Sequence, residues 1–227
     1  MKAELLFCFS NLEKMGFLPE KIDEYVVTHS QDEPDLLKRL SKETWQKILN
    51  PAMLSEHYQG RILSILSKML QPNIILEIGT YTGYSALCLA EGLPENGILH
   101  TIDHNEELVD FQKKYFSLSP YKHQIKQHLG NALEIIPSIK GNYDLVFIDA
   151  DKNNYANYFN LIIDKMNKGG IIISDNVLWY GKVLEKPDPK DEDTKALIAY
   201  NELLKKDERL ESVMLPIRDG LTLSRVK

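Results

Sequence analysis

From residue 74 onward, short runs rich in β-branched residues alternate with longer stretches that have helical spacing, and this alternation constrains the fold most. Each link between consecutive runs is long enough for a crossover helix. We therefore expect parallel strands, right-handed connections and helices on both faces of the sheet. The predicted strands are 74–79, 98–103, 125–130, 143–149 and 169–175, and the predicted helices between them include 84–93 and 105–117. The pattern is typical of a doubly wound α/β protein.

The end of the chain departs from this alternation. After a predicted helix at 192–206, the segments "LESVMLP" and "GLTLSRV" both have strand character, and only the turn around "IRDG" separates them. That turn is too short for a crossover helix but suits a hairpin, so the last strand should run antiparallel to its neighbour. The complete prediction is a seven-stranded, mostly parallel sheet whose last strand is antiparallel.

Residues 1–70 contain no convincing strand and are predicted to form three or four helices, among them "SKETWQKIL" and "SEHYQGRILSILSKML". No linker rich in Gly, Ser or Pro separates them from residue 74. We therefore expect residues 1–227 to form a single domain, with 1–70 as a helical lid beside a core of residues 71–227.

The composition restricts the class of partner. A chain of 227 residues with 43% hydrophobic and 26% charged residues suits one soluble domain, and its net charge of -6 offers no attraction to nucleic acid or an anionic membrane. No window approaches the roughly 18 apolar residues of a membrane span, and the polar residues around the short N-terminal apolar stretch do not suit a signal peptide. Cys8 and Cys88 are too few for a disulfide framework. We expect a cytoplasmic protein with reduced thiols that acts on a small molecule.

The segment "LEIGTYTGYSALCLA" is predicted to be a strand, a tight turn and a helix. Gly79 and Gly83 would let the backbone approach a ligand beside the free N–H groups of the helix start, although the dinucleotide pattern GxGxxG is absent. Glu77, inside the strand, suits a cationic or amino-bearing ligand. Asp103, at the end of the next strand, either accepts hydrogen bonds from ribose hydroxyls or caps the helix that begins near Asn105.

Charged residues gather at two further strand ends, in "YDLVFIDADKNNY" and "GGIIISDN". Asp149 follows the fourth strand, and Asp175 and Asn176 end the fifth, which should lie beside it. Three oxygen donors without Cys or His suit a hard cation, Mg²⁺ first and Ca²⁺ or Mn²⁺ as alternatives. Taken singly, Asp149 suits a helix cap and the Asp-Asn pair suits a turn. Lys152 at the start of a helix, where the dipole disfavours a cation, favours a joint site over these local explanations.

At this point the sequence resembles a known family. "FIDADKNNY" and "SDNVLWYG" are similar to motifs of the cation-dependent O-methyltransferases, the group that includes the caffeoyl-CoA and catechol O-methyltransferases, and most of all to small bacterial members. "PAMLSEHYQG" and "LPIRDGLTLSRVK" extend the match from about residue 20 to the end of the chain. The glycine turn and acidic strand ends also resemble the S-adenosylmethionine (SAM) site of class I methyltransferases, whose Rossmann-like sheet has the predicted strand pattern.

The resemblance implies a role for individual residues. Asp149, Asp175 and Asn176 would hold the metal, and Lys152 would be the general base. The residues implied around SAM are Glu77, Gly79, Tyr81, Gly83, Ser85, Asp103, Ala132 and Asp149. Those implied beside the acceptor are Met53, Trp179, Tyr180 and Asp219. Core or interface packing is the alternative for the two aromatic residues. Asp151 is expected to hydrogen-bond nearby without binding the metal.

The implied activity is O-methylation of a phenol with two vicinal hydroxyls, catechol-like or caffeoyl-type, by a homodimer. Chelation of both oxygens by a divalent cation would acidify the hydroxyl, Lys152 would accept its proton, and the oxygen would attack the methyl group in line with sulfur. The alternatives are a SAM-binding protein without turnover and, disfavoured by the missing GxGxxG, a nucleotide-dependent oxidoreductase.

Two departures leave the acceptor open. Arg218 stands where relatives commonly have Gly, so we expect a cation beside the substrate mouth. The mixed-charge loop 185–193 does not clearly favour the phosphates of a CoA ester, so a small catechol-like phenol is preferred.

Overall fold

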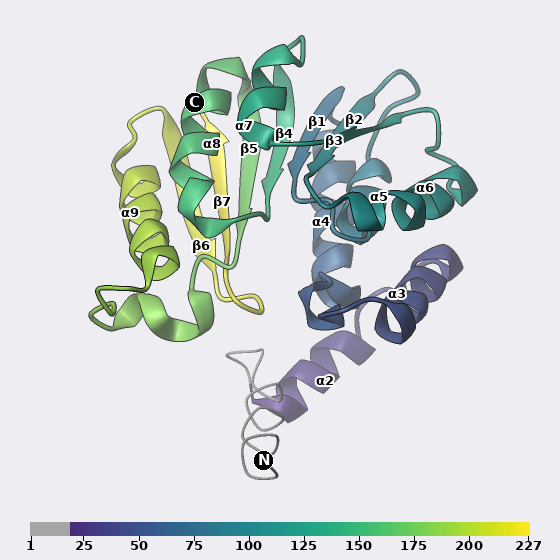
Figure 1. Ribbon diagram of the computed structural model, residues 1–227, viewed down its shortest axis with the longest axis horizontal. Coiled ribbons are helices and arrows are strands. Elements are labelled where there is room, and N and C mark those ends of the chain that lie inside the picture. Colours follow the sequence, from purple (N-terminus) through teal and green to yellow (C-terminus); the bar gives the residue numbers. More distant parts are fainter. Residues whose placement is uncertain (1–18) are drawn as a thin grey trace.

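The computed structural model describes residues 19–227, and its centre is a seven-stranded sheet in the order β3-β2-β1-β4-β5-β7-β6 (Figure 1). The strands are β1 (Ile74–Ile78), β2 (Ile98–Asp103), β3 (Ile125–Leu129), β4 (Tyr143–Ile148), β5 (Met166–Asp175), β6 (Leu210–Leu215) and β7 (Leu221–Val226). Only β7 is antiparallel to its neighbours, and it lies between β5 and β6. The predicted Rossmann-like sheet with an inserted antiparallel strand is therefore confirmed.

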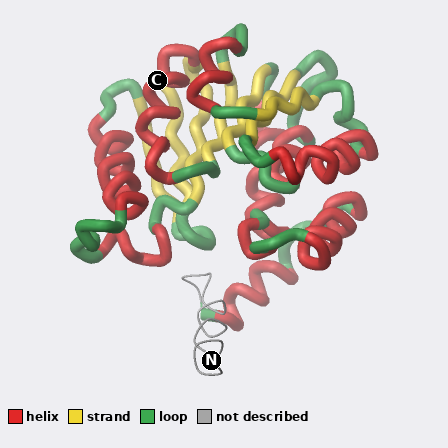
Figure 2. Tube along the Cα trace, in the orientation of Figure 1, coloured by secondary structure: helices red, strands yellow, loops and turns green. Residues whose placement is uncertain are grey.

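Helices pack on both faces of the sheet (Figure 2). The α-helices are α2 (Glu20–Thr28), α3 (Asp35–Lys47), α4 (Glu56–Leu70), α5 (Tyr84–Ala90), α6 (Val109–Leu118), α7 (Ala132–Ile135), α8 (Tyr155–Ile162) and α9 (Glu192–Lys206). Short 3₁₀ turns that matter for the site are η1 (Pro51–Met53), η2 (Glu106–Leu108), η4 (Lys152–Asn154) and η6 (Trp179–Leu184). Side chains of α3 to α6 share one hydrophobic core, and those of α7 to α9 share the other.

Strand β4 shows how the sequence places the sheet between these two cores. Val146 and Ile148 pack in the core that contains α8 and α9, whereas Phe147 packs in the core that contains α4 and α5. All three side chains are fully buried, as expected for a central strand covered on both faces. The apolar run ends where the strand leaves both cores, and the first residue beyond it is Asp149.

The N-terminal prediction is confirmed for the part of it that the structure describes. Helices α2, α3 and α4 occupy most of residues 19–70, and α4 packs against α5. The predicted segment 1–18, which includes Cys8, lies outside the described residues, and Cys88 is a buried free thiol. Within residues 19–227, no helix is long and apolar enough to cross a membrane.

Candidate functional site

The carboxyl ends of β4 and β5 bring the predicted charged residues together. The two strands pair in parallel, with Ile148 opposite Ser174, so Asp149 and Asp175 follow at the same edge. The Nζ atom of Lys152, which starts η4, lies 3.2 Å from Asp149 Oδ1 and 2.7 Å from Asn176 Oδ1. Both oxygens therefore point at one positively charged group.

Asp175 is the most deeply placed member of this cluster. Its Oδ1 accepts a hydrogen bond from the backbone N–H of Asn176 at 2.7 Å, and its Oδ2 accepts one from Gln59 Nε2 of α4 at 2.5 Å. Burial, and next the charge of Asp149, raise the pKa of Asp175, while the charge of Lys152 opposes this. The two carboxyl groups thus lie near enough for their charges to interact.

Lys152 is held by aromatic residues as well as by oxygens. Its Nζ donates to Tyr155 Oη at 2.7 Å and lies 5.7 Å from the centre of the Trp179 ring. The Tyr155 hydroxyl in turn donates to the backbone oxygen of Asp175 at 3.0 Å. Tyr155 was not predicted from the sequence, although its position three residues after Lys152, on the same helical face, was a usable signal.

An amide stands beside the two carboxylates of this cluster. Among residues 19–227, no three His, Cys, Asp or Glu side chains gather in a group that suits a metal ion. A metal bound here would therefore take the oxygen of Asn176 as a further donor. Asp151 faces away, because its carboxylate accepts hydrogen bonds from Tyr158 and Asn154.

The glycine turn brings the end of β1 against the end of β4. Gly79 has φ 103°, and a Cβ atom there would lie 1.8 Å from the backbone oxygen of Asp149. Gly83, at φ 88°, immediately precedes α5. Only glycine fits the first position without moving the backbone.

Asp103 holds the turn from the neighbouring strand. Its Oδ2 accepts a hydrogen bond from the backbone N–H of Tyr81 at 2.7 Å, and its Oδ1 accepts one from that of Asn105 at 2.9 Å. The capping residue of η2 is Asn105 itself, whose side chain accepts from Glu107 N. The alternative prediction that Asp103 caps this helix is therefore wrong.

Glu77 is a fully buried carboxyl group on the ligand side of this turn. Burial, with smaller contributions from the charges of Asp149 and Asp103, raises its pKa to about 8, against the opposing effect of the Ser85 and Thr101 hydroxyls. Its Oε2 accepts from Thr101 Oγ1 at 2.5 Å, whereas its Oε1 has no hydrogen-bond partner within the described chain. One buried oxygen is thus left for a donor from outside the protein.

The remaining predicted SAM residue, Ala132, is the first residue of α7 and is buried. Its side chain carries no polar group, so only its backbone can contact a ligand. The preceding residue, Asn131, uses its side chain to accept from Leu133 N and so fixes this helix start.

The predicted acceptor residues differ in their surroundings. Asp219 is buried and its Oδ1 accepts from the backbone N–H of Tyr180, while its Oδ2 and Trp179 Nε1 lack partners among residues 19–227. The Tyr180 side chain is 60% exposed, which excludes core packing for that residue, whereas Trp179 packs partly against the core of α8 and α9. Met53 is 61% exposed in η1, and no hydrogen bond ties it to the cluster.

Arg218 lies beside two of the predicted acceptor residues. Its guanidinium donates to the backbone oxygens of Leu54 and Ser55 at the start of α4, and its charge opposes the rise in the pKa of Asp219 and of Tyr180.

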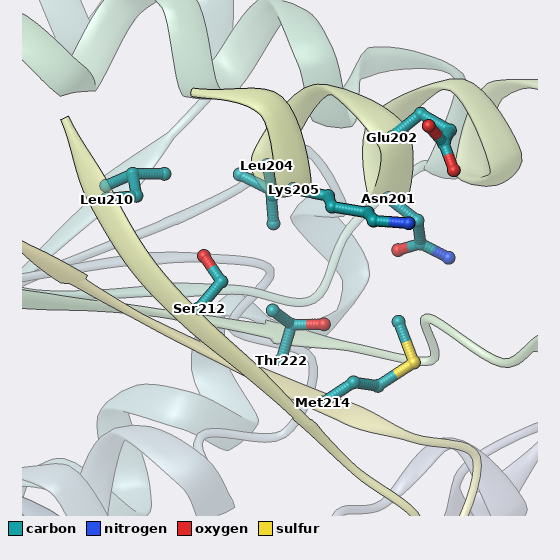
Figure 3. A pocket seen from close by; sticks show the side chains of 8 residues that line it. All are labelled: Asn201, Glu202, Leu204, Lys205, Leu210, Ser212, Met214 and Thr222. Atoms are coloured by element: carbon teal, nitrogen blue, oxygen red, sulfur yellow. The ribbon is translucent and has the colours of Figure 1, made fainter. Parts of the chain in front are cut away.

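A separate cavity of about 350 Å³ lies between α9 and the β6–β7 hairpin (Figure 3). It is lined by Asn201, Glu202, Leu204, Lys205, Leu210, Ser212, Met214 and Thr222. None of the predicted site residues lines it.

Comparisons with known proteins agree with this geometry. The profile of a family described as O-methyltransferase matches residues 27–227. Caffeoyl-CoA O-methyltransferase 5 of Nicotiana tabacum is 35% identical over 204 residues, covering 85% of each chain. Caffeoyl-CoA O-methyltransferase 1 of Arabidopsis thaliana is also 35% identical over 204 residues, covering 85% of this chain and 78% of its own.

Solved structures show the same architecture. The O-methyltransferase TomG of Streptomyces achromogenes, in complex with SAM, has a TM-score of 0.82 at 28% identity, covering 91% of this chain and 96% of its own. An O-methyltransferase of Bacillus cereus in complex with SAH has a TM-score of 0.85 at 26% identity, covering 95% of this chain and all of its own.

Proposed function

The chain belongs to the O-methyltransferase family, and from that premise we propose that it transfers a methyl group from SAM to one hydroxyl of a vicinal-diol phenol with the help of a divalent cation. The observation that carries this proposal is the meeting of Asp149, Asp175 and Asn176 with Lys152 at one edge of the sheet. A protein that only bound SAM would have no need for this cluster.

The donor set fits a hard cation. Two carboxylates and one amide oxygen, with no Cys or His, suit Mg²⁺ first and Ca²⁺ or Mn²⁺ as alternatives. Oxygens of Asp149 and Asn176 already converge on a positive charge, the ammonium of Lys152. A cation bound by these residues would lower the pKa of a chelated phenolic hydroxyl.

The glycine turn supports SAM as the methyl donor. Glu77 presents an unpartnered buried oxygen to a cationic ligand, Gly79 and Gly83 leave the backbone open, and Asp103 retains lone pairs for a ribose. Tyr81, Ser85, Ala132 and Asp149 would complete this site. The SAM complex of TomG and the SAH complex from Bacillus cereus are consistent with such a ligand.

Lys152, as the neutral amine, would take up the proton of the attacking hydroxyl at Nζ, and the oxygen would form its new bond to carbon as the bond between carbon and sulfur breaks. Trp179 and Tyr180 would stack beside the aromatic acceptor, and Met53 would cover it from η1. Asp219 Oδ2, which is buried and unpartnered, would accept a hydrogen bond from the acceptor. Alignment of the three reacting atoms is the main contribution expected from the protein.

For the acceptor we propose a small catechol-like phenol, with a caffeoyl-type ester as the alternative that the caffeoyl-CoA relatives favour. Arg218 donates to the backbone oxygens of Leu54 and Ser55, which leaves fewer of its N–H groups for the phosphates of CoA.

The decisive experiment is a methyl-transfer assay on a panel of vicinal diphenols, with caffeoyl-CoA included and the matching monophenols as controls. We expect product from the diphenols only, and its loss when a chelator removes the cation. If SAM binds but no diphenol is methylated, the catalytic proposal is wrong and the binding-protein alternative stands.

We also propose a cytoplasmic homodimer that binds neither nucleic acid nor membranes, in line with the net charge of -6. Sedimentation equilibrium should return twice the chain mass of 26.1 kDa, and a monomer mass would contradict the dimer.

A further inference from the structure

The turn between β6 and β7 is tied to the start of α4 by Arg218. This residue has φ 49°, which is unfavourable for a side chain larger than glycine. Its Nη1 donates to the backbone oxygen of Leu54 at 2.8 Å and also to that of Ser55. Helix α4 begins without a hydrogen bond from a capping side chain, and the guanidinium ties down the two carbonyl groups that come just before its first residue.

The same guanidinium reaches a side chain inside the protein. Arg218 Nη1 lies 3.5 Å from Oε1 of Gln59, a residue of α4 that is 1% exposed. An arginine has donors only, so it favours the amide orientation in which Oε1 faces Arg218 and Nε2 faces the other way. In that orientation Nε2 donates to Asp175 Oδ2 at 2.5 Å.

The contacts thus form a line of three side chains from the β6–β7 turn, through α4, to the end of β5. Asp175 is fully buried, and its other oxygen is engaged by the backbone N–H of Asn176. With one donor on each oxygen, the carboxylate has a single orientation. A carboxylate held in this way is ready to bind a cation without losing further conformational freedom.

We propose that Gln59 and Arg218 are positioning residues for the cation site: Arg218 orients the amide of Gln59, and Gln59 orients the carboxylate of Asp175. This inference rests on the proposed function, because Asp175 is there a ligand of the cation. It goes beyond that function in making the helical segment before β1 and the β6–β7 turn part of the metal site.

The first test measures Mn²⁺ affinity of the whole protein by electron paramagnetic resonance, with SAM affinity measured in parallel. Gln59→Leu should weaken Mn²⁺ binding about 10-fold or more, as removal of groups that orient metal ligands does, and leave SAM affinity within about 2-fold. Gln46→Leu, the same replacement at an exposed position of α3, is the matched control and should bind Mn²⁺ like the parent.

The Arg218→Gly variant separates the contribution of the Arg218 side chain to Mn²⁺ binding from that of the backbone conformation at this position. Glycine relieves the unfavourable φ, so any weakening of Mn²⁺ binding must come from the lost guanidinium; we expect about 3-fold or more, with partial rescue in Arg218→Lys. Gln71→Gly is the control, because Gln71 also has φ 49° but is exposed and its side chain makes no hydrogen bond. Unchanged Mn²⁺ affinity in both Gln59→Leu and Arg218→Gly would overturn the inference.

A second readout needs no metal. Hydrogen exchange of the amides of residues 54–60 should be faster in metal-free Arg218→Gly than in the parent and in Gln71→Gly. If the parent binds no Mn²⁺, the proposed function fails, and unchanged exchange in Arg218→Gly would overturn the positioning role by itself.

Discussion

At the scale of single residues, the surroundings of Lys152 restrict its chemistry most. Its ammonium is buried among two oxygens of the charged cluster, the Tyr155 hydroxyl and the Trp179 ring. A lysine that served only for solubility would keep its charged end in water. This position beside the charged cluster fits the role proposed for Lys152.

Lys152→Met should lower kcat about 100-fold or more, because the acceptor hydroxyl loses its base. Mn²⁺ affinity should stay the same or rise, since a positive charge 3.2 Å from Asp149 is removed. Lys182→Met is the control: Lys182 also lies over the Trp179 ring, at 6.0 Å, but is exposed. Steady-state kinetics of both variants test the proposal that Lys152 is the general base. A Lys152→Met enzyme with the kcat of the parent at neutral pH would contradict it.

The raised pKa of Glu77 predicts that the binding of SAM releases a proton. Because its pKa is raised to about 8, the free protein holds this carboxyl protonated at pH 7, and a cationic ligand at its unpartnered oxygen should displace the proton. Binding of SAM without metal should release up to about one proton at pH 7 and none well above pH 8. Calorimetry in two buffers of different ionisation enthalpy measures this. Proton release that persists in Glu77→Gln would assign it to another group.

The residue scale also shows what the sequence could not reveal. Asp149, Asp175 and Asn176 were predictable because parallel strands end at one edge of a sheet. Gln59 was not, because its partner lies 116 residues away and its position in α4 looks like any other in an amphipathic helix. The direction of the Arg218 side chain depends on the same long-range packing.

At the scale of elements, the contact between the ends of β1 and β4 is the tightest part of the site. Gly79 N donates to Ile102 O and Asp149 N donates to Ile78 O, so β1 is held on both sides where the glycine turn begins. The proposed methyl donor and cation sites thus lie on neighbouring strand ends, and a shift of one strand end would alter both.

Gly79→Ala should destabilise the protein by about 3 kcal/mol or more and abolish SAM binding, because the added carbon would meet the Asp149 backbone. Gly169→Ala is the matched control. Gly169 also has positive φ, at 83°, but the nearest atom to an added Cβ is 3.8 Å away, so only the conformational cost of about 1 kcal/mol should appear. Urea unfolding and SAM titration of both variants provide the comparison, and equal losses would argue against a backbone clash.

Element bounds were predictable where composition changes sharply. Strand β2 and helix α9 have the predicted bounds, whereas β5 begins at Met166, three residues before the prediction, because Gly169 and Gly170 resemble a turn. Met166 pairs with Tyr143 and Ile171 pairs with Leu145 of β4, so the two glycines lie at an irregularity within the strand, where Gly169 has φ 83°. Sheet neighbours thus override local preference.

At the scale of the whole molecule, stability toward acid should depend on a histidine pair between β2 and β3. His100 Nδ1 lies 2.9 Å from His128 Nε2. Burial, and then the charge of His128, lower the pKa of His100 to about 4, and burial lowers that of His128. As the pH falls, the two histidines are protonated in the unfolded chain before they are protonated in the folded protein. The contribution of the pair to the free energy of unfolding is therefore complete above about pH 6.5 and is lost as the pH falls toward 4.

The parent should therefore lose about 1 kcal/mol more unfolding free energy between pH 7 and pH 5 than His100→Asn/His128→Asn, a figure reduced for the partial exposure of both rings. Urea titrations at the two pH values measure the difference. His104→Asn, at an exposed histidine, should keep the slope of the parent. A parent and double variant with the same slope would show that the pair does not titrate in this range.

The order of strands has a consequence for how the chain is made. Strand β6 leaves the ribosome before β7, yet its only neighbour in the sheet is β7, which occupies the place beside β5. Until β7 has been synthesised, β5 is an unpaired edge strand and β6 has no neighbour with which to pair. Asp175, at the end of β5, then lies on this unpaired edge of the sheet. A nascent chain that stalls between the two strands would therefore expose unpaired backbone N–H and C=O groups along β5. Chaperones should bind such a chain in preference to the complete one.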